Sequence, residues 1–374
     1  MNTRTRSHRI VLAFSGGLNS SVAIPWLVAQ EGGGPREIVT IALDLGQTGE
    51  LEEVRDRALG IGAVRSHVLD VRDEFARDHV LRALKADALA DERSPMVSAL
   101  AAPLIARKLV EIAGIEQSDV VAHGAADAAA AARLEAAVRA LSPNLKVLAP
   151  ARDWTMTRLD AIGYAAARGI TVPVTAETPH SADENIWGRA IVSGAPEKMD
   201  AWDEAPDDLF TLTRPARACP NEPAYLDIAF ERGVPTAVNN VPMPLVDLLS
   251  TINMIAGGHG VGRVETASRP LREISESPAA VALHAAHAEL QKLVMSKEAL
   301  RFSKRVGREY ADVIDRGAWF SPLRESLDAY VDRIQDRVTG AIRLKFFKGD
   351  ARIVGRKVVE PKVAKRLRVV AKTH

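Results

Sequence analysis

Apolar and polar positions along the first 170 residues follow two alternating periods. Short apolar runs bounded by turn residues predict buried strands, and longer segments with apolar residues three or four positions apart predict helices. Strands are expected at 10–14, 37–45, 64–71, 119–123 and 146–149. Helices are expected at 19–30, 50–60, 74–90, 98–113, 127–141 and 155–168. Strands that alternate with helices through short turns predict a parallel sheet covered on both faces.

The pattern changes near residue 172, where prolines and polar residues interrupt the alternation. Beyond this point strands are expected at 226–231 and 235–239, and helices at 243–256, 279–298, 304–316 and 322–338. Two apolar segments, 341–347 and 351–354, flank a Lys-Gly-Asp turn and predict a closing hairpin. The predicted fold class is α/β, with a parallel-sheet nucleotide-binding domain followed by a second, α+β domain. The domain boundaries are expected at 1–171 and 172–356, with a basic tail at 357–374.

One loop of the first domain combines glycines and hydroxyls in a way that suits phosphate binding. An apolar run leads into a loop and helix start that read Ala13, Phe14, Ser15, Gly16, Gly17, Leu18, Asn19, Ser20 and Ser21. Glycines let the backbone approach an anion closely, and a helix N-terminus offers free N–H groups and a partial positive charge. The loop lacks the lysine of a Walker-type motif. It predicts a phosphate cradle of another kind, and an ordinary Gly-rich turn is the alternative.

Two more polar segments follow strands of the same predicted sheet. They are Asp44-Leu45-Gly46-Gln47 and His123-Gly124. Ligands of parallel sheets bind beyond the C-terminal ends of the strands. We therefore expect these two segments and the phosphate loop to meet around one nucleotide.

Composition narrows the class of protein. A chain of 374 residues with 47% hydrophobic and 26% charged residues is typical of a globular protein with two domains. The net charge of +1 predicts no general attraction to nucleic acid or to a membrane surface. The single cysteine, Cys219, excludes an intramolecular disulfide, and the histidines show no metal-ligand grouping, so no structural metal is expected. Without a signal segment or a spanning apolar run, a cytoplasmic location is expected.

The chain resembles the argininosuccinate synthase family over nearly its full length. The three segments above carry the resemblance together with several others. These are Leu100-Ala101, Pro103 to Lys108, Val110 to Ala113, Val147 to Pro150, Ser181 to Arg189, Ile255 to Gly257, His259 to Arg263, Leu344 to Gly349, and Val354 to Arg356.

The resemblance implies an ATP-dependent C–N ligase. In the family the ureido oxygen of citrulline attacks the α-phosphorus of ATP, pyrophosphate leaves with its Mg²⁺, and the amine of aspartate then displaces AMP. By resemblance, residues 13–21 with Leu43 and Gly124 would bind ATP, and Ser15, Asn19, Ser20 and Arg133 would serve catalysis. The second domain would be a synthetase and oligomerisation domain, which implies a homo-oligomer, either a dimer or a tetramer.

The departures from the family pattern lie where the amino-acid substrates should bind. Asn19 stands where the family loop has aspartate, and Ser94 where it has a ligand tyrosine. A polar family segment that contacts both amino acids is replaced by Ala128–Ala132, which predicts a helix start capped by Asp127. The remaining candidates for substrate binding are Ser94, Ser98, Arg133, Ser181, Ser268 and Ser275.

These losses favour a changed substrate. Each lost hydrogen bond to a charged ligand group costs about 1.5–3 kcal/mol, so five or six losses exceed what a typical amino-acid affinity contains. The sequence favours a family member that adenylylates a carbonyl or carboxylate oxygen of another small molecule. It would couple that acceptor to an amine such as aspartate, in specialised biosynthesis. Two alternatives stay open: a genuine argininosuccinate synthase, and a catalytically inactive nucleotide-binding paralogue.

Overall fold

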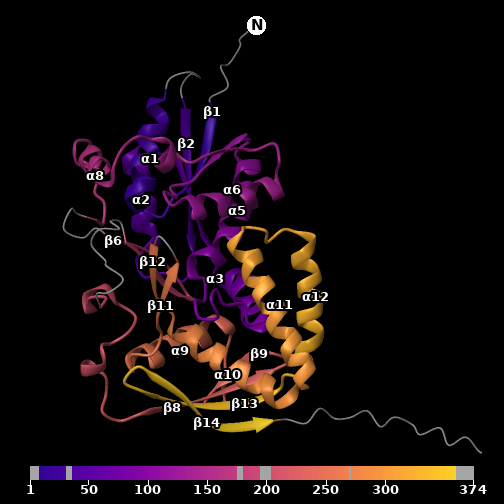
Figure 1. The fold of residues 1–374 in the computed structure, drawn as a ribbon. Helices are drawn as coiled ribbons and strands as arrows, with labels where there is room; N and C mark the ends of the chain where they lie inside the picture. The colour runs from indigo at the N-terminus through magenta and orange to yellow at the C-terminus, as the bar shows by residue number, and fades with distance from the viewer. Residues whose placement is uncertain (1–7, 31–35, 175–179, 194–203, 269–270, 359–374) are drawn as a thin grey trace, which may run out of the picture.

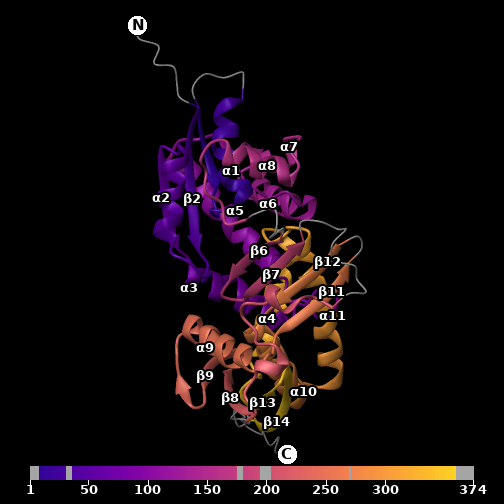
Figure 2. The same cartoon turned by 90° about the vertical axis from the view of Figure 1, so that its left-hand side faces the viewer.

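The computed structural model describes residues 8–30, 36–174, 180–193, 204–268 and 271–358 (Figure 1). A parallel sheet with its helices forms one end of an elongated molecule, and an antiparallel sheet with long helices forms the other. Figure 2 shows a third, smaller sheet between them. No helix in the described ranges is long and apolar enough to cross a membrane.

The first sheet has five parallel strands in the order β3-β2-β1-β4-β5. Their bounds are β1 His8–Ala13, β2 Arg36–Asp44, β3 Arg65–Asp70, β4 Val120–Ala122 and β5 Lys146–Leu148. All the strands point the same way, so their C-terminal ends share the edge that faces the second half of the chain (Figure 1). The predicted parallel sheet is confirmed.

Alternate residues of the central strands pack against helices on opposite faces of this sheet. Ile10 and Leu12 contact the helices α1 (Leu18–Ala29) and α2 (Leu51–Ile61) on one face. Val11 contacts α5 (Val97–Ile115) and α6 (Ala128–Leu141) on the other face. Because successive strand side chains point to opposite faces, this covering explains why the strands are apolar throughout.

Two helices predicted in the first half differ from those in the structure. The segment predicted as one helix at 74–90 forms α3 (Arg72–Phe75), a π-helical turn (Ala76–Val80) and α4 (Leu81–Ala86), and Asp87 ends it in the left-handed region. The segment predicted at 155–168 forms α8 (Arg158–Ala166), and a short helix that was not predicted, α7 (Pro150–Asp153), precedes it. Thr157 starts α8 as part of a reciprocal capping box with Asp160, which fixes the start three residues later than predicted.

The second half of the chain contains two antiparallel sheets. One has the order β10-β9-β8-β13-β14, and the other has the order β11-β12-β7-β6. The bounds of the first are β8 Ala224–Glu231, β9 Val234–Val238, β10 Val241–Pro242, β13 Gly340–Phe347 and β14 Asp350–Val358. The bounds of the second are β6 His180–Asn185, β7 Gly188–Ser193, β11 Arg263–Ser268 and β12 Leu271–Glu276.

The four-stranded sheet was not predicted, because its hairpins are short and polar and lack an alternating apolar pattern. The closing hairpin of β13 and β14 was predicted, but β14 extends to Val358. The predicted tail therefore begins inside a strand, and residues 359–374 lie outside the described part of the chain.

Four long helices complete the second half: α9 Leu245–Gly258, α10 Pro278–Val294, α11 Lys297–Asp315 and α12 Pro322–Gln335. Two 3-10 turns, Asp207–Leu209 and Ala216–Ala218, precede them. The helix predicted at 279–298 ends at Val294, and α11 begins earlier than the predicted residue 304. The cause is Ser296, whose hydroxyl accepts a hydrogen bond from the backbone N–H of Ala299 and caps a new helix.

The main hydrophobic core takes side chains from both halves of the chain. It includes Phe75, Val80, Leu84 and Leu100 together with Trp187, Leu226, Leu283, Tyr310 and Ile342. The segment from α3 to the start of α5 therefore packs into the second half, although it lies within the first in sequence. The division of the chain at residue 171 stays a prediction.

Candidate functional site

The loop between β1 and α1 turns sharply at the C-terminal edge of the parallel sheet. Gly16 has φ +74°, a backbone conformation that residues with a Cβ adopt at a cost. The Ser15 and Ser20 hydroxyl oxygens lie 3.3 Å apart, and the Ser20 hydroxyl donates to the carbonyl of Gly17 at 3.2 Å. The turn thus gathers two hydroxyls and two glycine backbones at the start of one helix.

This helix start offers unused donors to an anion. Gly17 is the N-cap of α1 and supplies no side-chain cap, and the backbone N–H of Ser21 makes the first helical bond, to Gly17 O at 3.0 Å. The N–H groups of the three preceding helical residues come before that bond and face the loop. The hydroxyl of Ser21 is buried and has no hydrogen-bond partner among the described residues. A polyphosphate fits this set of donors.

Two neighbouring segments contact the phosphate loop. Arg57 of α2 donates from Nη1 to the carbonyl of Gly16 at 2.8 Å. From the other side, Asn19 donates from Nδ2 to the carbonyl of Gly124 at 3.2 Å. A Cβ added to Gly124 would lie only 3.0 Å from the backbone nitrogen of Ser20. The predicted meeting of the phosphate loop with His123-Gly124 is therefore present.

The third segment, 44–47, faces the β6–β7 hairpin. The Ile186 N–H donates to Leu45 O at 2.8 Å, and the Glu184 carboxylate accepts from the N–H of Thr48 at 2.8 Å. A Cβ on Gly46, whose φ is +89°, would lie 2.8 Å from the Cβ of Ile186. The hairpin is thus fixed beside the sheet edge that carries the phosphate loop.

Comparison with protein-family models identifies the N-terminal and the C-terminal part of the chain. Residues 9–171 match the family model described as the arginosuccinate synthase N-terminal HUP domain, and residues 180–364 match the arginosuccinate synthase C-terminal domain. The chain belongs to the argininosuccinate synthase family.

Relatives in this family match nearly the whole chain. The argininosuccinate synthase of Trichodesmium erythraeum is 42% identical over 94% of this chain and 89% of its own length. That of Rubrobacter xylanophilus is 44% identical over 93% of this chain and 85% of its own length. Among solved structures, the U34-tRNA thiolase NcsA from Methanococcus maripaludis shows a TM-score of 0.30 at 15% identity, over 45% of this chain and 60% of that one. A likeness that weak carries no argument.

The family uses ATP with Mg²⁺, and the hydrogen-bond donors of the phosphate loop suit the phosphates of ATP. The phosphate loop supplies N–H and hydroxyl groups, which bind phosphate oxygens. The described residues contain no group of three or more His, Cys, Asp or Glu that could hold a metal ion by themselves. This donor set fits Mg²⁺ that is held mainly by the phosphate oxygens of ATP and by water.

The remaining residues predicted for ATP lie along the same edge. Ala13 ends β1, and the N–H of buried Phe14 donates to Ile41 O at 2.9 Å. Leu18 is buried as the first residue of α1. The carbonyl of Leu43 already accepts a hydrogen bond of 2.8 Å from Nε2 of Gln47. Contact of Leu43 with adenine stays a prediction.

Several predicted substrate-binding side chains make internal contacts. Arg133 donates from Nε and Nη2 to the backbone carbonyl and side-chain carboxylate of Asp315, at 2.9 Å each. The buried Ser94 hydroxyl accepts from the N–H of Met96 at 3.3 Å. Ser275 is buried on β12 beside Ala190. The side chains of Ser181 on β6 and Ser268 on β11 lie outside the described part of the structure.

Ser98 lies near a carboxylate that sequence reasoning missed. The buried Ser98 hydroxyl lies close enough to the carboxyl group of Asp183 on β6 to act to lower its pKa. Desolvation by the surrounding protein acts more strongly and raises the pKa of Asp183. Asp183 keeps an exposed surface although protein surrounds its carboxyl group, so the site is open on one side. The place of Asp183 within the Ser181–Arg189 segment, which carries the family resemblance, was the available signal.

The helix predicted from Asp127 is present and starts as expected. Asp127 is the N-cap of α6, and its carboxylate accepts from the N–H of Ala130 at 2.8 Å. Ala128 and Ala129 are exposed at the first turn. Methyl groups thus occupy the helix start that follows Gly124.

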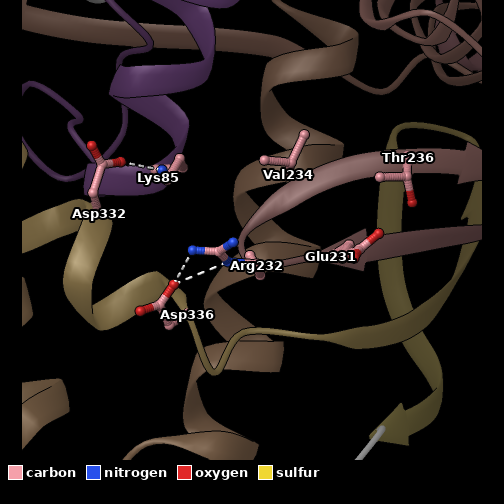
Figure 3. A pocket seen from close by; sticks show the side chains of 7 residues that line it. All are labelled: Lys85, Glu231, Arg232, Val234, Thr236, Asp332 and Asp336. Carbon is pink, nitrogen blue, oxygen red and sulfur yellow. Dashed lines mark hydrogen bonds and ion pairs between the residues drawn. The ribbon is translucent and has the colours of Figure 1, made fainter. Parts of the chain in front are cut away.

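A separate cavity of about 520 Å³ lies in the second half of the molecule, between α4, the β8–β9 turn and α12 (Figure 3). Four of its charged side chains form two ion pairs. Arg232 binds Asp336 at 3.0 Å, and Lys85 binds Asp332. None of the residues predicted for ATP or substrate lines this cavity.

Proposed function

We propose that this protein is an argininosuccinate synthase that joins citrulline to aspartate and converts ATP to AMP and pyrophosphate. The observation that carries the proposal is identity of 42–44% to proteins named argininosuccinate synthase over 93–94% of the chain. Both family models, including the HUP domain that holds the phosphate loop, match in order. The donors collected at the start of α1 are consistent with it.

The proposed reaction has two steps, and the phosphate loop would serve the first of them. The ureido oxygen of citrulline would form a bond to the α-phosphorus as the bond to pyrophosphate breaks. The aspartate amine would then attack the ureido carbon, and AMP would leave with the C–O bonding electrons. Ser15, Ser20 and the N–H groups of the first turn would hold the departing pyrophosphate oxygens. Mg²⁺ supplies charge neutralisation of the pyrophosphate when it is bound.

Asp183 is the acid we assign to the nucleotide side of the site. It is exposed on β6, in the hairpin whose far end is fixed to Leu45 by Ile186. Its carboxylate oxygens are suited to Mg²⁺ or to its water ligands. Our candidates for the phosphate contacts remain the hydroxyls of Ser15 and Ser20 and the backbone N–H of Asn19, whose side chain binds Gly124.

A second function, ligation of a different acceptor, is favoured by the side chains near the amino-acid site. Ala128 and Ala129 replace polar residues, the Ser94 hydroxyl is used by Met96, and Arg133 is held by Asp315. Such a site would still adenylylate a carbonyl or carboxylate oxygen and couple it to an amine such as aspartate. Assembly into a dimer or tetramer stays a prediction under either function.

The test is release of AMP and pyrophosphate from Mg-ATP by the purified protein. Citrulline and aspartate are supplied singly and together, and a Ser20→Ala variant serves as the control for the phosphate loop. Release that requires both amino acids, with argininosuccinate as the product, is the expected result. Release only with a metabolite extract would contradict citrulline as the acceptor and support the second function. ATP binding without turnover in any mixture would refute both.

A further inference from the structure

The loop between β4 and α6, residues 123–127, lies directly against the phosphate loop. We call it the Gly124 loop. A Cβ on Gly124 would meet Ser20 N at 3.0 Å, Ser20 Cα at 3.3 Å and the carbonyl carbon of Asn19 at 3.4 Å. This contact is between backbones, so a small displacement of the Gly124 loop changes the position of the first turn of α1. The N–H groups of that turn are the donors available to phosphate.

Asn19 makes the side-chain hydrogen bond between the two loops. Its Nδ2 donates to the carbonyl oxygen of Gly124 at 3.2 Å. The carbonyl can only accept, which assigns the donating amide nitrogen to this end of the side chain. An aspartate at position 19 would have no proton to donate at neutral pH, and its negative charge would face the carbonyl oxygen. The bond therefore requires the amide.

The first end of the Gly124 loop is fixed to the parallel sheet, because the N–H of His123 donates to the carbonyl of Leu148 at 3.1 Å. His123 is 1% exposed, and its Nδ1 accepts from the N–H of Ala125 at 3.3 Å. Burial lowers the pKa of His123 to about 4, so the ring is neutral and Nδ1 stays free to accept. Asp127 then caps α6 through Ala130. With the loop fixed at His123 and at Asp127, the Asn19 amide determines how closely its middle approaches the phosphate loop.

We propose that Asn19 is a positioning residue that holds the Gly124 loop on the phosphate loop, and that this chain requires asparagine at a position where aspartate cannot replace it. The proposal rests on ATP use by the phosphate loop and not on the identity of the acceptor. The proposal predicts that the substitution that restores the residue of the family pattern is harmful. Asn19→Asp, which changes the loop to the aspartate of the family pattern, should weaken the site.

The experiment compares Asn19→Ala and Asn19→Asp with the unaltered protein. Dissociation constants for Mg-ATP are measured by calorimetry at pH 8. Loss of the donor in Asn19→Ala should weaken binding about fivefold, and loss of the donor with added repulsion in Asn19→Asp should weaken it about 30-fold. Asn239→Asp is the matched control. The Asn239 Oδ1 accepts from the N–H of Asp227 at 2.9 Å, so a carboxylate preserves that bond and ATP binding should not change.

A second measurement tests the hydrogen bond without ATP. Amide hydrogen exchange of residues 123–127 in the ligand-free protein should be faster in both Asn19 variants and unchanged in the control. ATP binding by Asn19→Asp that equals or exceeds that of the unaltered protein would overturn the proposal. Unchanged exchange in both variants would overturn it as well. If the unaltered protein binds no ATP, the proposed function fails, and the exchange measurement still decides the role of Asn19.

Discussion

Three buried histidines should make the protein sensitive to mild acid. Burial lowers the pKa of His79 to about 3 and the pKa values of His123 and His287 to about 4. The same side chains in the unfolded chain have pKa values of about 6.5. As pH falls below 6.5, the unfolded chain therefore binds protons that the native protein does not. Stability is full above pH 6.5 and is lost as pH falls from there toward the native pKa values.

The loss of unfolding free energy at pH 5 depends mainly on the pKa of the histidines in the unfolded chain. Each histidine that stays neutral in the native protein costs about 2 kcal/mol of unfolding free energy at pH 5 relative to pH 8. The three together cost about 6 kcal/mol, which is comparable with the whole stability of many domains. Carboxylates whose pKa values are lowered by ion pairs, such as Asp227, act mostly below this window.

Replacement of His79 by phenylalanine removes the contribution of one of the three histidines to the loss of stability at pH 5. The His79 ring stacks on Trp319, with ring centroids 4.7 Å apart, and neither ring nitrogen has a hydrogen-bond partner among the described residues. Phenylalanine preserves the stacking and removes the titration. We expect His79→Phe to be within about 1 kcal/mol of the unaltered protein at pH 8 and about 2 kcal/mol more stable at pH 5.

The assay is urea unfolding of both proteins at pH 8 and pH 5, followed by tryptophan fluorescence and circular dichroism. Phe75→Leu is the control, because it alters the same core without a titrating group and should lower stability equally at both pH values. An equal loss of stability between pH 8 and pH 5 in His79→Phe and the unaltered protein would refute the reasoning.

Three further substitutions test other contacts. Glu276→Gln should lower the unfolding free energy by about 3 kcal/mol in urea titrations, because the fully buried carboxylate accepts from three backbone N–H groups and faces Arg189. Arg57→Gln should raise the dissociation constant for ATP about tenfold through loss of the bond to Gly16, whereas Arg55→Gln, whose partner is Glu52, should leave it unchanged. Asp127→Ala should cost about 1 kcal/mol as a lost helix cap, measured by thermal unfolding.

The parallel sheet could be predicted because its central strands are largely apolar runs separated by helices of ordinary length. Asp127 was also predictable as a helix N-cap, since aspartate is a preferred N-cap residue and five alanines, which favour a helix, follow it. The polar hairpins β6–β7 and β11–β12 were not, because their stability comes from contacts with distant segments such as Leu45. The local sequence pattern of the hairpins does not indicate such contacts.

The same limit applies to the candidate site. Glycines and hydroxyls of the phosphate loop could be identified because their use depends on backbone geometry within nine residues. Arg133 lies in the predicted helix, yet its guanidinium binds Asp315, which is 182 positions away. No local pattern connects those two residues. Asp183 was overlooked because its significance depends on the protein around it, including Ser98.

The packing of α3 and α4 into the second half of the molecule has a consequence for synthesis of the chain. Phe75, Val80 and Leu84 leave the ribosome early, whereas their partners Leu283 and Tyr310 follow some 200 residues later. At about 5–20 residues per second, these apolar side chains wait for roughly ten seconds or more without their native neighbours. During that interval the nascent chain presents a surface suited to chaperones and prone to aggregation. A fragment that ends near residue 171 would keep that surface permanently, so the parallel sheet should not be obtainable as a well-behaved isolated domain.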